Sequence, residues 1–225
     1  MKDLNKKAFE GLTFFIIALA ALIFLPAWTL NYWQAWLFLA TFALSVTLIT
    51  LYLMKKDPKL LERRMGAGAK AEKEKTQKTI QFVAQLAFIA IIVFPAIDHR
   101  FGWSIMSPYI SIGGDILVAL GLLFVFFVFK ENSFTSSIIE VADEQKVIST
   151  GPYAIMRHPM YSGALLMLIG LPMALGSWWG LLAFIPMLFV IIWRLLDEEK
   201  FLNKNLKGYK EYCQKVRFRL VPYLW

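Results

Sequence analysis

The strongest constraint on this chain is a set of apolar stretches, each long enough to cross a lipid bilayer. An α-helix needs about 20 residues to cross a hydrocarbon core of about 30 Å. Four stretches of this length run through 12–30, 33–54, 80–97 and 109–129, and a longer one runs through 161–196. The chain has 58% hydrophobic residues, whereas an average soluble protein has about 45–50%. We therefore predict an all-α, polytopic integral membrane protein.

The last apolar stretch is too long for a single crossing and is interrupted in its middle. The interruption is the run Gly176–Gly180, which has a glycine at each end. Such a run is typical of a turn. We expect a tight C-terminal helical hairpin of two shorter helices, which brings the bundle to about six crossings.

The basic residues predict the orientation of the chain. Of its 24 Lys and Arg residues, 20 lie at 1–10, 55–78 and 194–225, and three more lie at 130–158. With about six crossings, all these segments fall on one side of the membrane. Because cytoplasmic loops carry the excess of Lys and Arg, we expect both termini to be cytoplasmic. The net charge of +8 then reflects this topology. We expect contact with membrane lipids and no nucleic-acid partner.

We expect one membrane domain in two parts. Residues 1–130 form the N-terminal transmembrane helices, with a cytoplasmic linker at 55–78. Lys and Glu alternate in the second half of this linker, which is typical of a solvated spacer without a chemical role. Residues 131–225 form the cofactor-binding and catalytic region, with the transmembrane hairpin and an amphipathic tail.

We expect several polar residues outside the main motif to have structural roles and to take no part in chemistry. Asp98 and His99 are expected in a solvated turn, and Asp115 is expected at a helix start, where the helix dipole stabilises a carboxylate. Cys213 is the only cysteine, and the chain has two histidines, which excludes a disulfide framework and a Cys/His metal site. The tail carries an apolar stripe typical of a helix that docks on the membrane or covers a site: Tyr209, Tyr212 and Val216.

Motifs of the common cofactor folds are absent, but a polar, turn-rich run stands directly before the hairpin. The sequence has no Rossmann, P-loop, hydrolase-elbow or zincin motif. In the run 151–163, Pro152 favours the first turn of a short helix. Pro159 starts the next helix and excludes His158 from the α region. Arg157 and His158 at such a helix start fit a cradle for a polar ligand, and they fit an interfacial belt equally well.

A second polar cluster ends the hairpin. Arg194 closes the last apolar stretch, where its side chain either reaches for lipid headgroups or holds a ligand. Three carboxylates follow directly, at residues 197–199. Beside anionic headgroups they are unfavourable unless a positive group neutralises them. This cluster therefore favours a cationic ligand.

These residues, in this order and spacing, resemble the isoprenylcysteine carboxyl methyltransferase family, in its bacterial and archaeal form, which is related to the phospholipid methyltransferases. A weaker similarity covers Asp57-Pro58 and residues 61–64. The main resemblance covers about the C-terminal third of the chain and rests on these residues: Gly151–Tyr153, Arg157–Gly163, Arg194, Glu198, Glu199, Tyr209, Tyr212, Val216, Arg217 and Pro222.

The resemblance implies a membrane methyltransferase that uses S-adenosyl-L-methionine without a Rossmann fold. It implies that Arg194 binds the acceptor, and that Arg194 and His158 act in catalysis. Aromatic faces and a carboxylate suit a sulfonium cofactor, and the fork of an arginine suits a carboxylate acceptor. The resemblance places these residues around the cofactor: Lys146, Val147, Ile148, Tyr153, His158, Pro159, Tyr161 and Glu198.

The expected function is methyl transfer at the cytoplasmic membrane surface. The acceptor is expected to be a lipophilic or lipidated molecule from the bilayer that bears a carboxylate, as for isoprenylcysteine. Three alternatives stay open. They are N-methylation of a phospholipid or other lipid amine, nicotinamide-dependent reduction of a sterol-like lipid, and a non-enzymatic role as a membrane scaffold or transporter.

Overall fold

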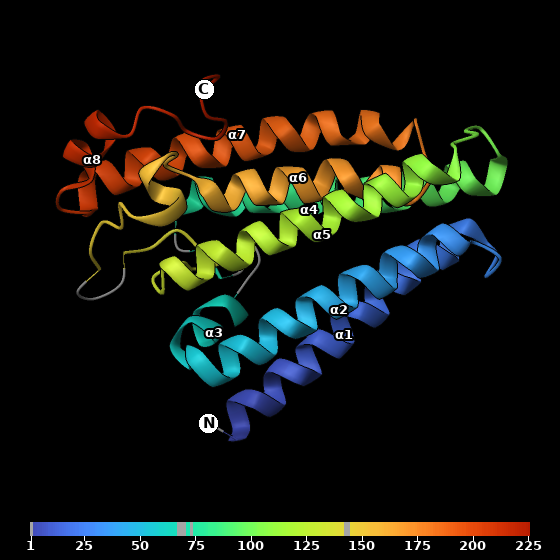
Figure 1. Cartoon of the computed structure of the whole chain (residues 1–225), viewed down its shortest axis with the longest axis horizontal. Helices are drawn as coiled ribbons and strands as arrows, with labels where there is room; N and C mark the ends of the chain where they lie inside the picture. Colours follow the sequence, from blue (N-terminus) through green and yellow to red (C-terminus); the bar gives the residue numbers. More distant parts are fainter. Residues whose placement is uncertain (1, 67–70, 73, 142–144) are drawn as a thin grey trace.

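The computed structural model describes residues 2–66, 71–72, 74–141 and 145–225 as an all-α bundle (Figure 1). Some of the predicted linker, residues 67–70 and 73, lies outside the described residues. Within the described chain, five helices are long and apolar enough to cross a membrane: α1 (Lys2–Ala27), α2 (Trp33–Lys56), α4 (Lys75–Phe101), α5 (Pro108–Glu131) and α7 (Gly180–Asn205). The remaining helices are the apolar α6 (Pro159–Ala174) and three short ones: α3 (Pro58–Met65), η1 (Gly151–Ala154) and α8 (Tyr209–Lys215). The prediction of a polytopic helical membrane bundle is confirmed.

The C-terminal hairpin forms as predicted, with one difference in length. The chain turns between α6 and α7, where Gly176 adopts a positive φ of 74°. Helix α6 has only 16 residues, but α7 has 26 and is not a short helix. It continues to Asn205 because the Glu and Lys residues after its apolar part are good helix formers.

The segments that carry most of the basic residues gather at one end of the bundle. In Figure 1, α3, η1, α8 and the N-terminus lie toward this end, which we call the basic end. The α1–α2, α4–α5 and α6–α7 connections lie at the opposite end, the turn end. The predicted separation of basic segments from turns is therefore present in the fold.

Helix α6 is fixed closely against α5. A Cβ atom at Gly121 would lie 2.6 Å from the carbonyl oxygen of Gly163, and one at Gly170 would lie 2.7 Å from that of Gly114. Only glycine permits such a close approach of two backbones, a common device of helix packing in membranes. At its basic end, α6 thus presents its first residues beside the end of α5.

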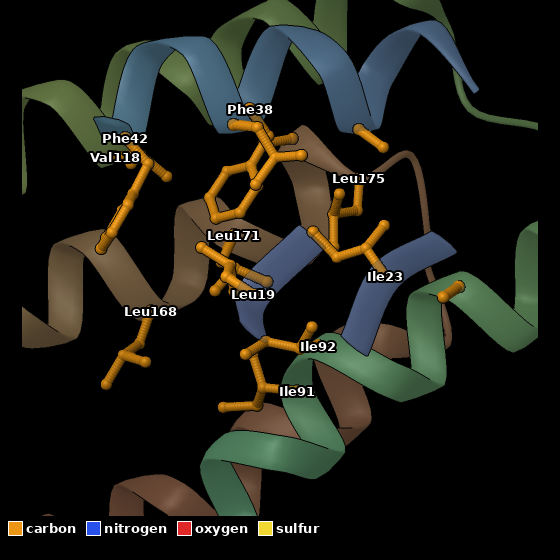
Figure 2. Packing of buried hydrophobic residues seen from close by; sticks show 14 of the residues in the cluster. Leu19, Ile23, Phe38, Phe42, Ile91, Ile92, Val118, Leu168, Leu171 and Leu175 are labelled. Atoms are coloured by element: carbon orange, nitrogen blue, oxygen red, sulfur yellow. The ribbon is translucent and has the colours of Figure 1, made fainter. Parts of the chain in front are cut away.

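A central apolar core holds the longer helices together. Figure 2 shows Ile23 of α1, Phe38 of α2, Ile91 of α4 and Leu171 of α6 within this core. Of these four side chains, three are fully buried and Leu171 is 2% exposed. Since apolar side chains gain little by leaving lipid, this close packing is what keeps the helices together in a bilayer.

The expectation that Asp98 and His99 lie in a solvated turn is wrong. Asp98 is 1% exposed, not solvated, because α4 continues to Phe101. Its carboxylate accepts hydrogen bonds from the backbone N–H of Ser104 at 2.7 Å and from the hydroxyls of Ser104 and Ser177. The His99 ring stacks on Tyr32, with 3.7 Å between ring centroids. These groups tie α4 to the α1–α2 and α6–α7 connections.

Asp115 does not lie at a helix start. Helix α5 begins at Pro108, about two turns earlier. The Asp115 side chain is 5% exposed, and within the described part of the chain neither carboxylate oxygen has a hydrogen-bond partner. The helix dipole at the first turn therefore does not explain this residue.

Candidate active site

A cleft at the basic end brings together most of the predicted cofactor residues. Its cavity volume is about 100 Å³, and the cleft around it is open to solvent. Two predicted residues lie outside its lining, Pro159 and Arg194. The predicted residues that do line it are Lys146, Val147, Ile148, Tyr153, His158, Tyr161 and Glu198.

Local backbone geometry places His158 directly before the first turn of α6. Pro159 is the first residue of that helix, and His158 precedes it with φ of −124° and ψ of 59°, outside the α region as predicted. The backbone N–H of His158 donates to the carbonyl of Arg219 at 3.0 Å, and that of Arg157 donates to Phe218 at 2.9 Å. The C-terminal segment therefore fixes the backbone of the two residues that precede α6.

Glu199 joins three basic side chains, whereas the sequence analysis named it only in the acidic triplet and in the family resemblance. Its carboxylate lies 2.9 Å from Nη1 of Arg157, 3.0 Å from Nε of Arg219 and 3.3 Å from Nε2 of His158. It is 7% exposed. The sequence offered one signal for a separate role of Glu199, which is its place next to Glu198 on a helix. Adjacent residues on a helix point about 100° apart. Glu198 and Glu199 therefore face different surroundings.

Glu198 is the acidic residue that faces the cleft without a basic partner. It accepts a hydrogen bond from the hydroxyl of Tyr161 at 2.6 Å. Within the described residues, no Lys, Arg or His forms an ion pair with it. Its neighbours in the acidic triplet are engaged elsewhere, since Asp197 accepts from the amide of Gln77 and Glu199 binds the basic cluster. The cleft thus keeps one carboxylate that suits a cationic ligand.

Neutral aromatic side chains form another part of the wall. The hydroxyl of Tyr212 donates to the carbonyl of Tyr153 at 2.7 Å, and Asn132 donates to the hydroxyl of Tyr153 at 3.1 Å. Burial raises the pKa of Tyr153 to about 12, so its phenol is neutral at physiological pH. Tyr209 also lines the cleft. Two residues of the apolar stripe, Tyr209 and Tyr212, therefore form part of the cleft wall, on α8.

Arg194 lies behind Tyr161, outside the cleft. Its side chain is 11% exposed, so the interpretation that it reaches for headgroups is wrong. A guanidinium has five N–H groups. All five are engaged, with the hydroxyl of Tyr161 at 3.2 Å, Oε1 of Gln77 at 3.4 Å, Oε1 of Gln81 at 2.7 Å, Oε1 of Glu72 at 2.7 Å and the carbonyl of Ser137 at 3.1 Å.

Glu72 shows that part of the linker is not a solvated spacer. Its side chain is 1% exposed, because Arg194 binds one of its carboxylate oxygens and the backbone N–H of Ile139 donates to the other at 3.1 Å. Ile139 lines the cleft. The linker therefore helps to hold the wall of the site.

Similar proteins point to one family. Residues 109–208 match the phospholipid methyltransferase family. Protein-S-isoprenylcysteine O-methyltransferase B of Arabidopsis thaliana is 31% identical over 142 residues, which cover 60% of this chain and 68% of the plant protein. The chain belongs to the phospholipid methyltransferase family, which includes the isoprenylcysteine methyltransferases.

Two further proteins are similar to parts of this chain. A rice protein, named "Probable protein-S-isoprenylcysteine O-methyltransferase" (Oryza sativa subsp. indica), is 29% identical over 145 residues, with 60% of this chain and 73% of the rice protein covered. The Delta(14)-sterol reductase of Mus musculus is 27% identical over 109 residues, but these cover only 25% of its length and 43% of this chain. The family resemblance predicted from the C-terminal residues is confirmed.

Proposed function

We propose that the protein transfers a methyl group from S-adenosyl-L-methionine to a lipophilic acceptor that bears a carboxylate, at the cytoplasmic membrane surface. The observation that carries this proposal is the cleft at the basic end, where Glu198 is a carboxylate without a basic partner among neutral tyrosines. Family membership supports methyl transfer, and the relatives named for isoprenylcysteine support a carboxylate acceptor.

The residues of the cleft fit this cofactor by charge and surface. The cofactor carries a sulfonium and an ammonium group, which suit the carboxylate of Glu198 and the aromatic rings of Tyr153 and Tyr161. Val147 and Ile148 offer apolar contacts for its adenosine part. When bound, S-adenosyl-L-methionine supplies an electrophilic methyl group on a positively charged sulfur.

The side chains of the protein then act mainly by positioning. A carboxylate acceptor is already ionised near neutral pH, so its methylation by in-line displacement needs no strong base. The arrangement of His158 agrees with this, since Nε2 lies 3.3 Å from Glu199 and the imidazole is 6% exposed. His158 is thus suited to shape the cleft and to contact the cofactor.

The short helix α6 gives the acceptor a route from the bilayer. Sixteen residues span about 24 Å, less than a hydrocarbon core of about 30 Å. Tyr161, in its first turn, therefore lies close to the hydrocarbon boundary. In the structure, Nε of Arg194 donates to the hydroxyl of Tyr161. The resemblance assigns Arg194 to the acceptor, and this assignment stays a prediction.

N-methylation of a lipid amine is the second candidate, favoured by the name of the matching family. An amine must lose a proton before it attacks, so this reaction needs a base near the cleft. Methyl transfer to a panel of long-chain carboxylic acids and matched amines separates the two candidates.

Calorimetric titration with S-adenosyl-L-methionine tests cofactor binding, and titration with NADPH tests the reductase alternative. We expect binding of the first and none of the second. His158→Ala and Glu198→Ala should each weaken cofactor binding about tenfold or more, because each removes a buried polar or charged contact. Glu211→Ala, an exposed residue of α8, is the control. Unchanged affinity in both cleft variants would refute the assignment.

Single-cysteine labelling tests the proposed cytoplasmic orientation. In a Cys213→Ser background, Lys59→Cys places a thiol at the basic end and Tyr109→Cys places one at the turn end, both at exposed positions. We expect an impermeant maleimide added to intact cells to label position 109 and to spare position 59. The reverse pattern would invert the topology.

A further inference from the structure

Arg64, beside the cleft, is a cation without an anionic partner among the described residues. Arg64, in the last turn of α3, donates from Nη1 to the carbonyl of Ser136 at 2.9 Å, and the same atom lies 3.7 Å from the sulfur of Met160. Its guanidinium lies over the ring of Phe129 at 5.1 Å. Among the residues that the structure describes, no carboxylate forms an ion pair with Arg64. Three arginines around the site each pair with a glutamate: Arg157, Arg194 and Arg219.

Without a carboxylate partner, the charge of Arg64 keeps a desolvation cost at its half-buried position. Burial lowers the pKa of its guanidinium, the nearby Tyr161 raises this pKa and the positive charge of Arg194 lowers it. The ring of Phe129 offsets only part of this cost. An anionic ligand beside Arg64 would offset much more, because opposite charges attract strongly away from water.

The helix that carries Arg64 is held firmly. The side chain of Asp57 accepts from the backbone N–H of Leu60 at 3.0 Å and caps α3. Leu60 and Leu61 are buried in an apolar cluster that includes Phe129. The hydroxyl of Ser137 donates to the carbonyl of Arg64 at 2.8 Å. Arg64 is therefore preorganised for a ligand, since its contacts already fix its direction.

An apolar groove lies in the membrane part of the protein, between α2 and α5. Its cavity volume is about 360 Å³. Near its basic end, the ring of Tyr52 meets Phe126 edge-on, with 4.9 Å between centroids. Phe126 lies one helical turn before Phe129, the ring under Arg64. The groove is lined by Ser45, Leu48, Ile49, Tyr52, Ala119, Leu122, Leu123 and Phe126.

We propose that Arg64 binds the anionic head group of the acceptor, whose hydrocarbon tail lies in the groove between α2 and α5. The head group then reaches the cleft past Met160, which lines it and contacts Arg64. This inference rests on the proposed carboxylate acceptor. Arg194, with all its N–H groups engaged, serves in this arrangement as a positioning residue for Tyr161.

Binding of an inert probe tests this inference without requiring methyl transfer. The probe is a long-chain alkyl sulfonate, compared with the alkyl trimethylammonium of equal chain length, in nanodiscs of zwitterionic lipid. Arg64→Gln should weaken sulfonate binding about tenfold or more and leave the ammonium unchanged. Arg63→Gln is the matched control, because Arg63 also donates to a loop carbonyl, that of Ser133, and lies over a ring, that of Phe134. It should change sulfonate binding by less than about twofold.

The outcomes separate this inference from the proposed function. Cofactor affinity should be unchanged in both variants, which excludes a folding defect. Ala119→Leu, which narrows the groove, should weaken the binding of long-chain sulfonates more than that of short ones. Equal sulfonate binding by wild type and Arg64→Gln, or full displacement of the sulfonate by anionic bilayer lipid, would overturn the inference. Sulfonate binding that depends on Arg64, with methylation confined to amines, would keep Arg64 as an anion site but refute the carboxylate acceptor, and with it the assignment of that anion as the acceptor.

Discussion

Glu199→Ala is expected to lower the melting temperature of the protein in detergent by roughly 6–20 °C. The substitution leaves Arg157, Arg219 and His158 buried or half-buried without their shared carboxylate. Breaking a buried ion pair by removing one partner costs about 3–5 kcal/mol. For a chain of this size, each kcal/mol corresponds to about 2–4 °C. Thermal unfolding followed by intrinsic tryptophan fluorescence measures this change.

Two glutamate variants serve as controls for this result. Glu211→Ala removes an equal charge from an exposed position of α8 and should leave the melting temperature unchanged. Glu198→Ala removes one hydrogen bond to Tyr161, so it should weaken cofactor binding with a much smaller loss of stability. A melting temperature of Glu199→Ala equal to that of wild type would show that the basic cluster does not need its carboxylate.

The transmembrane helices were predictable because their signal is local. Each apolar stretch of about 20 residues identifies its own helix, whatever it later packs against. Helix boundaries were less predictable, since the polar residues after 196 extend α7 and those at 98–100 extend α4. Hydropathy marks the end of the apolar surface, whereas the helix ends where its backbone pairing stops.

The site was predictable in part for the same reason. The residues around Pro159 are consecutive, so their turn and helix start follow from local backbone rules. The partners of Arg194 did not follow, because Gln81 and Glu72 lie 113 and 122 positions away in the sequence. The packing of α4 against α7 brings Gln81 to Arg194, and Glu72 lies in the linker just before α4. No periodicity within one helix encodes such a pair.

Arg194→Lys is expected to lower methyl transfer by about tenfold or more, and Arg194→Ala by about a hundredfold. The guanidinium of Arg194 reaches five acceptors spread over α4, α6, the linker and the loop after α5. A lysine ammonium has three N–H donors at a single point and cannot satisfy that arrangement. Turnover of labelled S-adenosyl-L-methionine with the best acceptor of the panel measures the loss.

The cofactor affinity of these variants tells how Arg194 acts. Arg194 lies outside the cleft, so we expect its loss to lower turnover while cofactor affinity stays within about threefold of wild type. Lys200→Ala, which removes an exposed charge from the same helix, should change neither. An equal loss of cofactor affinity would mean that Arg194 acts through Tyr161 on Glu198, the carboxylate assigned to the cofactor. Full activity of Arg194→Lys would show that a positive charge alone suffices there, and that the five-acceptor geometry plays no part in catalysis.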